Sequence, residues 1–268
     1  MFIIQDYAQP ETLEEAYQLL TARRNNVVLG GCAFLKMSKK KIGTAIDLSN
    51  LQLDYIHEKE ERIEIGAMTT FRSLEIAPCL NQYFNGVIPK SIKSILGVQF
   101  RNVVTVGGTV YSRYGFSDLI TALLSLDADV ELVQGGIMPL ETFLKTGSSK
   151  DILVKVILHK NNRLASYQMM RNSAADYPIL NAAVSKKGDD WKIVIGARPK
   201  RAEIAVKASE YLTCNEINET VINEAANIAV EELAFGTNMR GQKVYRQTIA
   251  APLVKRGIME VLQCELKL

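Results

Sequence analysis

Apolar residues recur at the spacing of one helix face near the start of the chain. From Leu13 to Leu20 they occupy positions i, i+3, i+4 and i+7, and Thr12 with Glu15 forms a capping box directly before them. An amphipathic helix is therefore expected here, between short apolar runs. Strands are expected at 2–4, 27–29 and 45–48, with a helical turn around 34–38. This order predicts a small α/β lobe over about the first 50 residues.

After residue 52 the pattern changes to hairpins with helices inserted among them. Two apolar runs flank the polar turn 58–61, as expected for a β-hairpin. Arg101 to Val106 is a β-type run that ends in Gly107-Gly108, so a strand is expected to stop at these glycines. Helices are expected after Thr70 and at 88–96 and 117–126, with strands at 130–133 and 152–158. This part predicts a second lobe of the α+β class.

A third section begins near Leu164. Three apolar-rich strands are expected at 166–170, 179–185 and 191–196, with a turn at 187–190 between the last two. Helices are expected at 205–212, 219–233 and 245–262. A three-stranded sheet followed by helices predicts a separate C-terminal domain.

Charge and hydropathy point away from nucleic acid and membrane. The 268 residues carry a formal net charge of only +3, and the densest basic run, Lys39-Lys40-Lys41, is too short for a nucleic-acid surface. The N-terminal residues lack the regions of a secretory signal, and no run approaches the ~20 apolar residues of a membrane span. A cytoplasmic protein without nucleic-acid or membrane-spanning contacts is therefore expected.

The metal-binding and nucleophilic residue types are scattered. Cys32, Cys79, Cys214 and Cys264 include no C-x-x-C pair, which fits reduced thiols in a cytoplasm. The two histidines lie outside any H-E-x-x-H setting. No catalytic or metal-binding residue is expected, so a cofactor is expected to supply any chemistry.

Two double glycines, Gly30-Gly31 and Gly107-Gly108, are candidate phosphate-binding loops. Each follows a β-type run. Glycine lets a ligand approach the backbone closely, successive N–H groups can form an anion-binding concavity, and a following helix N-terminus adds positive charge. Neither loop has the G-x-G-x-x-G pattern. A double glycine after a strand is most often only a tight turn, and Asp118 alone is typical of an acid in the first turn of a helix.

Several sequence motifs of this chain occur in the same order in one known family. Leu29 to Leu35 is similar to the family's first flavin loop, and Ile65 to Thr70 matches its I-G-A-x-T-T segment. Arg101 to Gly108 resembles the second flavin loop, with its helix at 117–128. The opening helix is matched by 10–16, and the C-terminal signature by 239–241, 245–246 and 253–256. The chain thus resembles the FAD-binding medium subunit of molybdenum hydroxylases, the family of xanthine dehydrogenase and carbon monoxide dehydrogenase.

This resemblance implies an α+β fold with two domains. The first, at 1–160, would be a two-lobed FAD-binding domain of the vanillyl-alcohol-oxidase type, with lobes at about 1–52 and 53–160. The second, at 164–268, would resemble the C-terminal domain of the carbon monoxide dehydrogenase flavoprotein, with its three-stranded antiparallel sheet and helices.

The resemblance also implies an oxidoreductase component. FAD would be bound non-covalently and would receive electrons from two [2Fe-2S] clusters on a small partner subunit. These clusters would accept electrons from a molybdopterin centre on a large partner subunit, and the flavin would pass electrons to NAD or another acceptor. Asp118 would contact a ribose or ribityl hydroxyl. The cofactor contacts expected in full are Leu29, Gly30, Gly31, Cys32, Ala33, Thr105, Gly107, Gly108, Thr109 and Asp118.

The loops depart from the family pattern in ways that keep two alternatives open. Cys32 and Ala33 replace more polar residues, and Thr109 stands where asparagine is usual. The bulkier segment 111–115 replaces A-S-P. One alternative is a flavin-free scaffold subunit of the same complex. The other is a stand-alone flavin oxidoreductase of the same fold. Tyr114 and Tyr167 are candidates to stack on a flavin, although an aromatic residue in a strand is more often part of the core.

Overall fold

The computed structural model describes residues 2–147 and 150–266, which divide between two units that interleave along the sequence. The first unit runs to residue 74 and adds 98–112 and 129–158. The second unit takes 75–97, 113–128 and the chain from 159 onward. The first unit carries both glycine loops, and the second carries Asp118.

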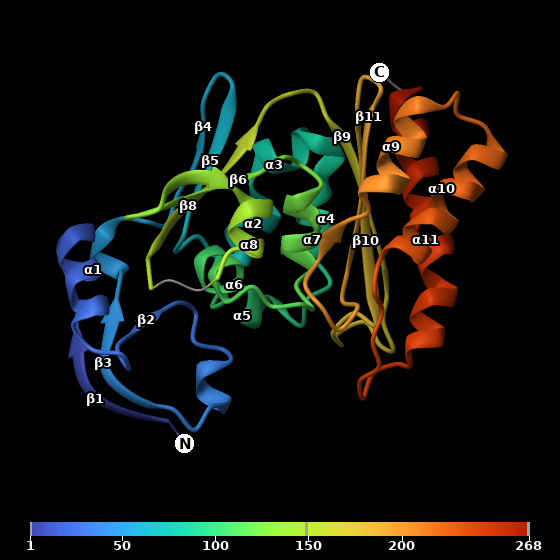
Figure 1. Cartoon of the computed structure of the whole chain (residues 1–268). Coiled ribbons are helices and arrows are strands. Elements are labelled where there is room, and N and C mark those ends of the chain that lie inside the picture. The colour runs from blue at the N-terminus through green and yellow to red at the C-terminus, as the bar shows by residue number, and fades with distance from the viewer. Residues whose placement is uncertain (1, 148–149, 267–268) are drawn as a thin grey trace. The chain divides into compact units, whose positions relative to one another are not determined.

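The first unit begins with a three-stranded parallel sheet in the order β1-β3-β2 (Figure 1). Its elements are β1 (Ile3–Ala8), α1 (Leu13–Ala22), β2 (Val27–Leu29) and β3 (Lys41–Asp47). The capping prediction is confirmed, because the Glu15 N–H donates to Thr12 Oγ1 at 3.1 Å. The apolar stripe of α1 places Ala16 and Leu20 in a core with Ile46 of β3. The α/β prediction for this lobe is therefore confirmed.

A five-stranded sheet in the order β4-β5-β8-β6-β7 completes the first unit. Its strands are β4 (Ile56–Glu58), β5 (Arg62–Gly66), β6 (Asp129–Leu132), β7 (Gly136–Pro139) and β8 (Leu153–His159). The hairpin expected around 58–61 is confirmed by the antiparallel pairing of β4 with β5. Ile152 and Val154 join the same core as α1, so one apolar cluster underlies both sheets of this unit.

Short helices connect these strands, and two of them replace a strand that the sequence predicts. The helices are α2 (Phe71–Ile76), α3 (Pro78–Gln82), α4 (Val87–Ile92), α5 (Val98–Arg101), α6 (Val106–Ser112), α7 (Asp118–Leu124) and α8 (Leu140–Lys145), with 3-10 turns at Leu35–Met37, Ser49–Leu51 and Phe84–Gly86. The strand expected over Arg101–Val106 is wrong: α5 ends at Arg101, α6 begins at Val106, and only the bridge from Thr105 to Thr70 is β-like. The Val103 and Val104 N–H groups both donate to the Phe100 carbonyl at 3.1 Å, so a turn after α5 replaces the strand that the β propensity of the valines predicts. The helix expected at 88–96 ends earlier, at Ile92, and Leu96 lies beyond it with a left-handed φ of +44°.

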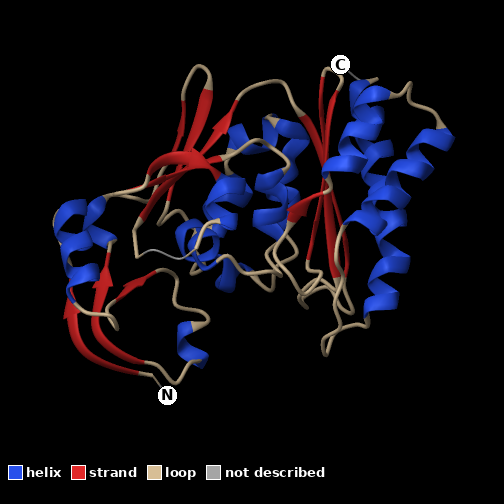
Figure 2. Ribbon diagram, viewed as in Figure 1, coloured by secondary structure: helices blue, strands red, loops and turns tan. Residues whose placement is uncertain are grey.

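The second unit is built on an antiparallel sheet in the order β12-β11-β10-β9. Its strands are β9 (Leu164–Met170), β10 (Leu180–Lys187), β11 (Asp190–Gly196) and β12 (Glu203–Ile204), followed by α9 (Val206–Cys214), α10 (Glu219–Glu232) and α11 (Lys243–Glu265). Figure 2 shows these three helices on one face of the sheet, where their apolar sides form the core of the unit. The sheet has four strands rather than the three expected, because β12 is only two residues long and shows no alternation in the sequence. None of the helices within the described ranges is long and apolar enough to span a membrane.

Candidate functional site

The first glycine loop leaves backbone donors available to a ligand. It follows the carboxyl end of β2 and leads into the 3-10 turn Leu35–Met37. Cys32 has a left-handed φ of +57°, a backbone reversal that turns successive N–H groups toward one side. The N–H groups of Cys32 and Ala33 donate to no acceptor within the described part of the chain, and both residues are partly exposed. The loop therefore has the character of an anion-binding concavity at the carboxyl edge of a parallel sheet, where ligands commonly bind.

The structure brings the two glycine loops together, backbone against backbone. A Cβ on Gly31 would lie 1.8 Å from the Val103 carbonyl oxygen, and one on Gly30 would lie 2.9 Å from Gly108 Cα. Both distances are shorter than real Cβ contacts, so only glycine fits at these positions. The two loops thus pack together in the first unit, although more than 70 residues separate them in the sequence.

The Thr105 side chain joins the loops. Its Oγ1 accepts the Gly108 N–H at 3.1 Å and the Gly31 N–H at a longer 3.4 Å. Thr105 is 5% exposed, so this hydroxyl is shielded from water by the loops that it holds. We therefore see its main role as fixing the first loop relative to the start of α6.

The second loop differs from the first because its own donors are already used. The Val106 N–H donates to the Thr69 carbonyl at 2.9 Å, and the Gly107 N–H to the Ala67 carbonyl at 2.7 Å. Thr109 N–H donates to the Thr105 carbonyl at 3.1 Å within α6. The second loop therefore braces the first, and Gly107 is required because a Cβ there would meet Ala67 at 2.8 Å.

Ala67 and Thr69 are contributors that the sequence analysis did not identify. They belong to the I-G-A-x-T-T motif, which matches the family in sequence but to which no role was assigned. Their carbonyl oxygens accept the first two N–H groups of α6. Thr69 Oγ1 also donates to the Tyr55 carbonyl at 2.8 Å and accepts the Tyr55 N–H at 3.1 Å, which ties the segment to the neighbouring strand connection. Arg101, at the end of α5, is 5% exposed and is part of the interior rather than the surface.

Cys32 is held by its own loop. Its thiol donates to the Gly30 carbonyl oxygen at 2.8 Å. Burial, and then the charge of Asp47, raise the pKa of the thiol, which disfavours the reactive thiolate form. The side chain therefore stabilises the turn, and the backbone of the loop carries its binding capacity.

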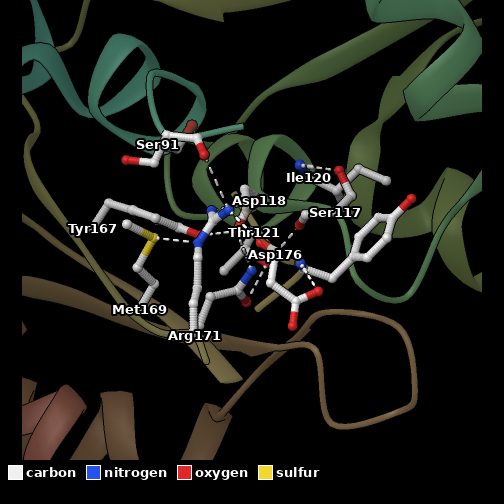
Figure 3. Close-up of polar contacts among 12 residues, drawn as sticks. Ser91, Ser117, Asp118, Ile120, Thr121, Tyr167, Met169, Arg171 and Asp176 are labelled. Atoms are coloured by element: carbon white, nitrogen blue, oxygen red, sulfur yellow. Dashed lines mark hydrogen bonds and ion pairs between the residues drawn. The ribbon is translucent and has the colours of Figure 1, made fainter. Parts of the chain in front are cut away.

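Asp118 lies in a buried polar network of the second unit (Figure 3). Its Oδ1 accepts the Asn181 side-chain amide at 3.1 Å and the Tyr167 hydroxyl, and its Oδ2 accepts the Arg171 guanidinium at 2.9 Å. The residue is buried, and burial raises the pKa of its carboxyl although Arg171 and the hydrogen bonds act in the opposite direction. Three side chains of its own unit thus engage this residue, and its contact with a cofactor hydroxyl stays a prediction.

Arg171 extends this network to a neighbouring loop. Its guanidinium donates to the Asp176 carbonyl at 2.9 Å and to Met169 Sδ at 2.8 Å. Tyr167 is a buried core residue whose hydroxyl is engaged by Asp118, and burial raises its pKa well above the ordinary value. Tyr114, the other aromatic candidate, stacks on Phe116 with ring centres 5.0 Å apart.

The first loop fits the pyrophosphate of FAD. Its free N–H groups supply donors without a formal charge, and its glycines remove the side chains that would keep a phosphate away. Among residues 2–147 and 150–266, no three His, Cys, Asp or Glu side chains gather as metal ligands do.

Comparisons with known proteins cover both parts of the chain. Residues 3–160 match the FAD binding domain in molybdopterin dehydrogenase, and residues 165–261 match the CO dehydrogenase flavoprotein C-terminal domain. The uncharacterised protein YgfM of Escherichia coli K12 is 26% identical over 263 residues, covering 94% of each chain. The nicotine 6-hydroxylase medium subunit of Paenarthrobacter nicotinovorans is 21% identical over 272 residues, covering 95% of this chain and 96% of that subunit.

Solved structures show the same fold. The carbon monoxide dehydrogenase of Hydrogenophaga pseudoflava contains a chain that superposes with a TM-score of 0.88 at 22% identity, covering 96% of this chain and 97% of that chain. Quinoline 2-oxidoreductase from Pseudomonas putida 86 gives a TM-score of 0.86 at 21% identity, with 96% of each chain covered.

Proposed function

Because this chain belongs to the family of FAD-binding domains of molybdopterin dehydrogenases, we propose that it carries electrons from partner iron–sulfur clusters to NAD or another acceptor. The chain is an FAD-containing oxidoreductase component, and its matched relatives include medium subunits of multi-subunit enzymes. When bound, FAD supplies the redox chemistry. The protein's own residues hold and orient it.

The observation that carries this proposal is the pair of unused N–H groups at Cys32 and Ala33. A pyrophosphate brings anionic oxygens that accept such donors, and the left-handed turn at Cys32 presents adjacent N–H groups together. Thr105 holds this turn in place through Gly31 and Gly108. The proposed cofactor contacts are Leu29, Gly30, Gly31, Cys32, Ala33, Thr105, Gly107, Gly108 and Thr109, with Asp118 as the proposed hydroxyl contact.

The proposed partners are a large molybdopterin subunit and a small subunit with [2Fe-2S] clusters. The printed names of the relatives support this, because nicotine 6-hydroxylase and the Sulfolobus acidocaldarius glyceraldehyde dehydrogenase each have a medium subunit or chain that matches over nearly its full length. We also propose a domain boundary between residues 160 and 164, supported by the two family matches at 3–160 and 165–261. A cytoplasmic site of action is supported by four cysteines that form no disulfide.

The first test is the visible absorption spectrum of the purified chain, before and after adding FAD and desalting. Retained bands of oxidised flavin that are released by acid would support non-covalent binding. The chain should then be mixed anaerobically with NADH, where loss of those bands would support NAD as the acceptor. A folded chain that stays colourless, alone and in its complex, would favour the flavin-free scaffold. Bands that resist NADH would point to another acceptor.

A further inference from the structure

An acidic residue lies directly beside the first glycine loop. Leu29, the last residue of β2, pairs with Asp47, the last residue of β3, in the parallel ladder of the first unit. Neighbouring strands lie about 4.8 Å apart. The loop begins directly after Leu29, so Asp47 stands at the same carboxyl edge of the sheet, one strand away from the free N–H donors.

The carboxyl of Asp47 is held in place by two hydrogen bonds. Its Oδ2 accepts the Tyr7 hydroxyl at 2.6 Å, and its Oδ1 accepts the Ser49 N–H at 2.9 Å. Tyr7 lies on β1 and Ser49 begins the 3-10 turn after β3, so the acid is fixed from two directions. Asp47 is partly exposed, and a carboxylate has about four acceptor positions. Hydroxyl groups of a ligand can therefore still reach its oxygens and donate to them.

The charge of Asp47 is not compensated by a cation. Within residues 2–147 and 150–266, no lysine or arginine forms an ion pair with it. Its field reaches the loop, because after burial it is the charge of Asp47 that raises the pKa of the Cys32 thiol, while Lys36 acts in the opposite direction. A bare carboxylate repels a phosphate bound next to it. Its place beside an anion-binding loop is explained if it serves a different part of the same ligand.

The chemistry of the proposed cofactor identifies that part. The adenosine ribose of FAD is bonded directly to the pyrophosphate, so it is the next group along from a phosphate held by the loop. Ribose offers two neighbouring hydroxyls, and a carboxylate offers two oxygens that accept them. Other α/β sheets bind dinucleotides in this way, with the phosphates on a glycine loop and a ribose hydroxyl on an acid further along the chain.

We propose that Asp47 binds the ribose hydroxyls of the adenosine half of FAD, and so favours the dinucleotide over a flavin mononucleotide. This inference rests on the proposed function, which supplies the cofactor. The sugar ring holds its two hydroxyls on one side, which suits a carboxylate fixed by Tyr7 and Ser49, whereas the flexible ribityl chain must first be ordered. Asp118, in contrast, is already engaged by Arg171 and two further side chains.

The test compares two ligands on the full chain after its flavin has been removed. One ligand is FAD, and the other is an FAD analogue whose adenosine lacks both ribose hydroxyls. Titration followed by flavin fluorescence gives both affinities. Wild type should bind the analogue about tenfold more weakly than FAD, as expected when hydrogen bonds to a charged acceptor are lost. Asp47→Asn should bind FAD about tenfold more weakly than wild type does, and the analogue no more weakly.

Asp6→Asn is the matched control. It makes the same change on the neighbouring strand β1, at a side chain that is 63% exposed and pairs with Arg23 at 3.9 Å. This variant should bind both ligands as wild type does. Thermal unfolding of each variant checks that it is folded.

The outcomes separate the ribose contact from the proposed function. If Asp47→Asn weakens both ligands equally, or changes neither, Asp47 does not contact the ribose. If it tightens both, the carboxylate only repels the pyrophosphate. If wild type binds FAD and the analogue equally, the inference is overturned even where the variant does not fold. The proposed function stands in all these cases. If the wild-type chain binds no FAD, alone or in its complex, the proposed function fails and the ribose contact fails with it.

Discussion

Arg171 donates to the carboxylate of Asp118 at 2.9 Å, and the two side chains are only 6% and 5% exposed. This pair connects the first turn of α7 to the end of β9. Breaking a buried pair by removing one partner is costly, because the remaining charge is then buried without compensation. The relationship therefore has a measurable consequence for folding.

We expect Asp118→Asn to lower the free energy of unfolding by about 3–5 kcal/mol. Urea unfolding followed by circular dichroism measures this change. The control is Glu141→Gln, which removes a solvent-exposed pair with Lys145 at 2.6 Å and should change stability by less than about 1 kcal/mol. Equal effects from the two variants would show that Arg171 is satisfied without Asp118.

Gly31→Ala should abolish FAD retention and destabilise the fold. The new methyl group would lie 1.8 Å from the Val103 carbonyl oxygen, so the two glycine loops must separate. Gly147→Ala is the matched control, because a Cβ there meets nothing within 4 Å and its φ is not left-handed. That variant should keep FAD and gain up to about 1 kcal/mol from the reduced freedom of the unfolded chain. Desalting after FAD addition, with a urea titration of each variant, measures both effects.

At position 32, backbone conformation should decide FAD binding. Cys32→Gly keeps the N–H donor and accepts the left-handed φ of +57°, so it should bind FAD within a few-fold of wild type. Cys32→Val keeps the donor but places a β-branched residue in a conformation that such side chains almost never adopt, so it should weaken binding. Fluorescence titration with FAD distinguishes them. If glycine loses FAD and valine retains it, the side chain rather than the backbone governs the loop.

Asp47 should make the first lobe sensitive to acid. Burial raises the pKa of its carboxyl, but hydrogen bonds from Tyr7, Ser49 and Gln9 outweigh burial and lower the pKa overall. A carboxyl with a depressed pKa stabilises the fold above its unfolded pKa and loses that contribution as the pH falls through its folded value. Tyr7→Phe removes the hydroxyl that donates to Asp47 Oδ2 at 2.6 Å.

The variant should therefore be less stable than wild type at neutral pH, and the difference should shrink as the pH falls below the ordinary pKa of an aspartate carboxyl. Urea midpoints at several pH values measure this convergence. A difference that is constant with pH would mean that Tyr7 contributes through packing rather than through the Asp47 carboxyl.

Local pattern predicted most of the elements correctly. The capping box at Thr12, the hairpin of β4 with β5 and the three long C-terminal helices follow from spacing and polarity alone. The parallel order β1-β3-β2 does not, because pairing between distant strands leaves no local signal. The run before Gly107-Gly108 was misassigned because a local turn, in which the Val103 and Val104 N–H groups both donate to the Phe100 carbonyl, leaves no mark in the apolar pattern.

The sequence predicted which loops form the candidate site, but not which of them offers N–H donors to a ligand. The sequence motifs identified both glycine loops. Only the structure shows that the first loop has free N–H donors, whereas the N–H donors of the second loop bond within the protein. Asp118 illustrates the same limit. Its position in the first turn of a helix was clear, while its partners Arg171 and Asn181 are 53 and 63 residues away in the sequence.

The burial of α7 has a consequence for biosynthesis. Every residue of this helix is buried, and Thr121 at its centre donates to Asn181 of β10, sixty residues later. On the ribosome, α7 therefore emerges well before the sheet that covers it. At elongation rates of about 5–20 residues per second, its apolar surface stays uncovered for several seconds or more. We expect the nascent chain to be a chaperone client in that interval, and its yield to depend on how quickly the following strands are translated.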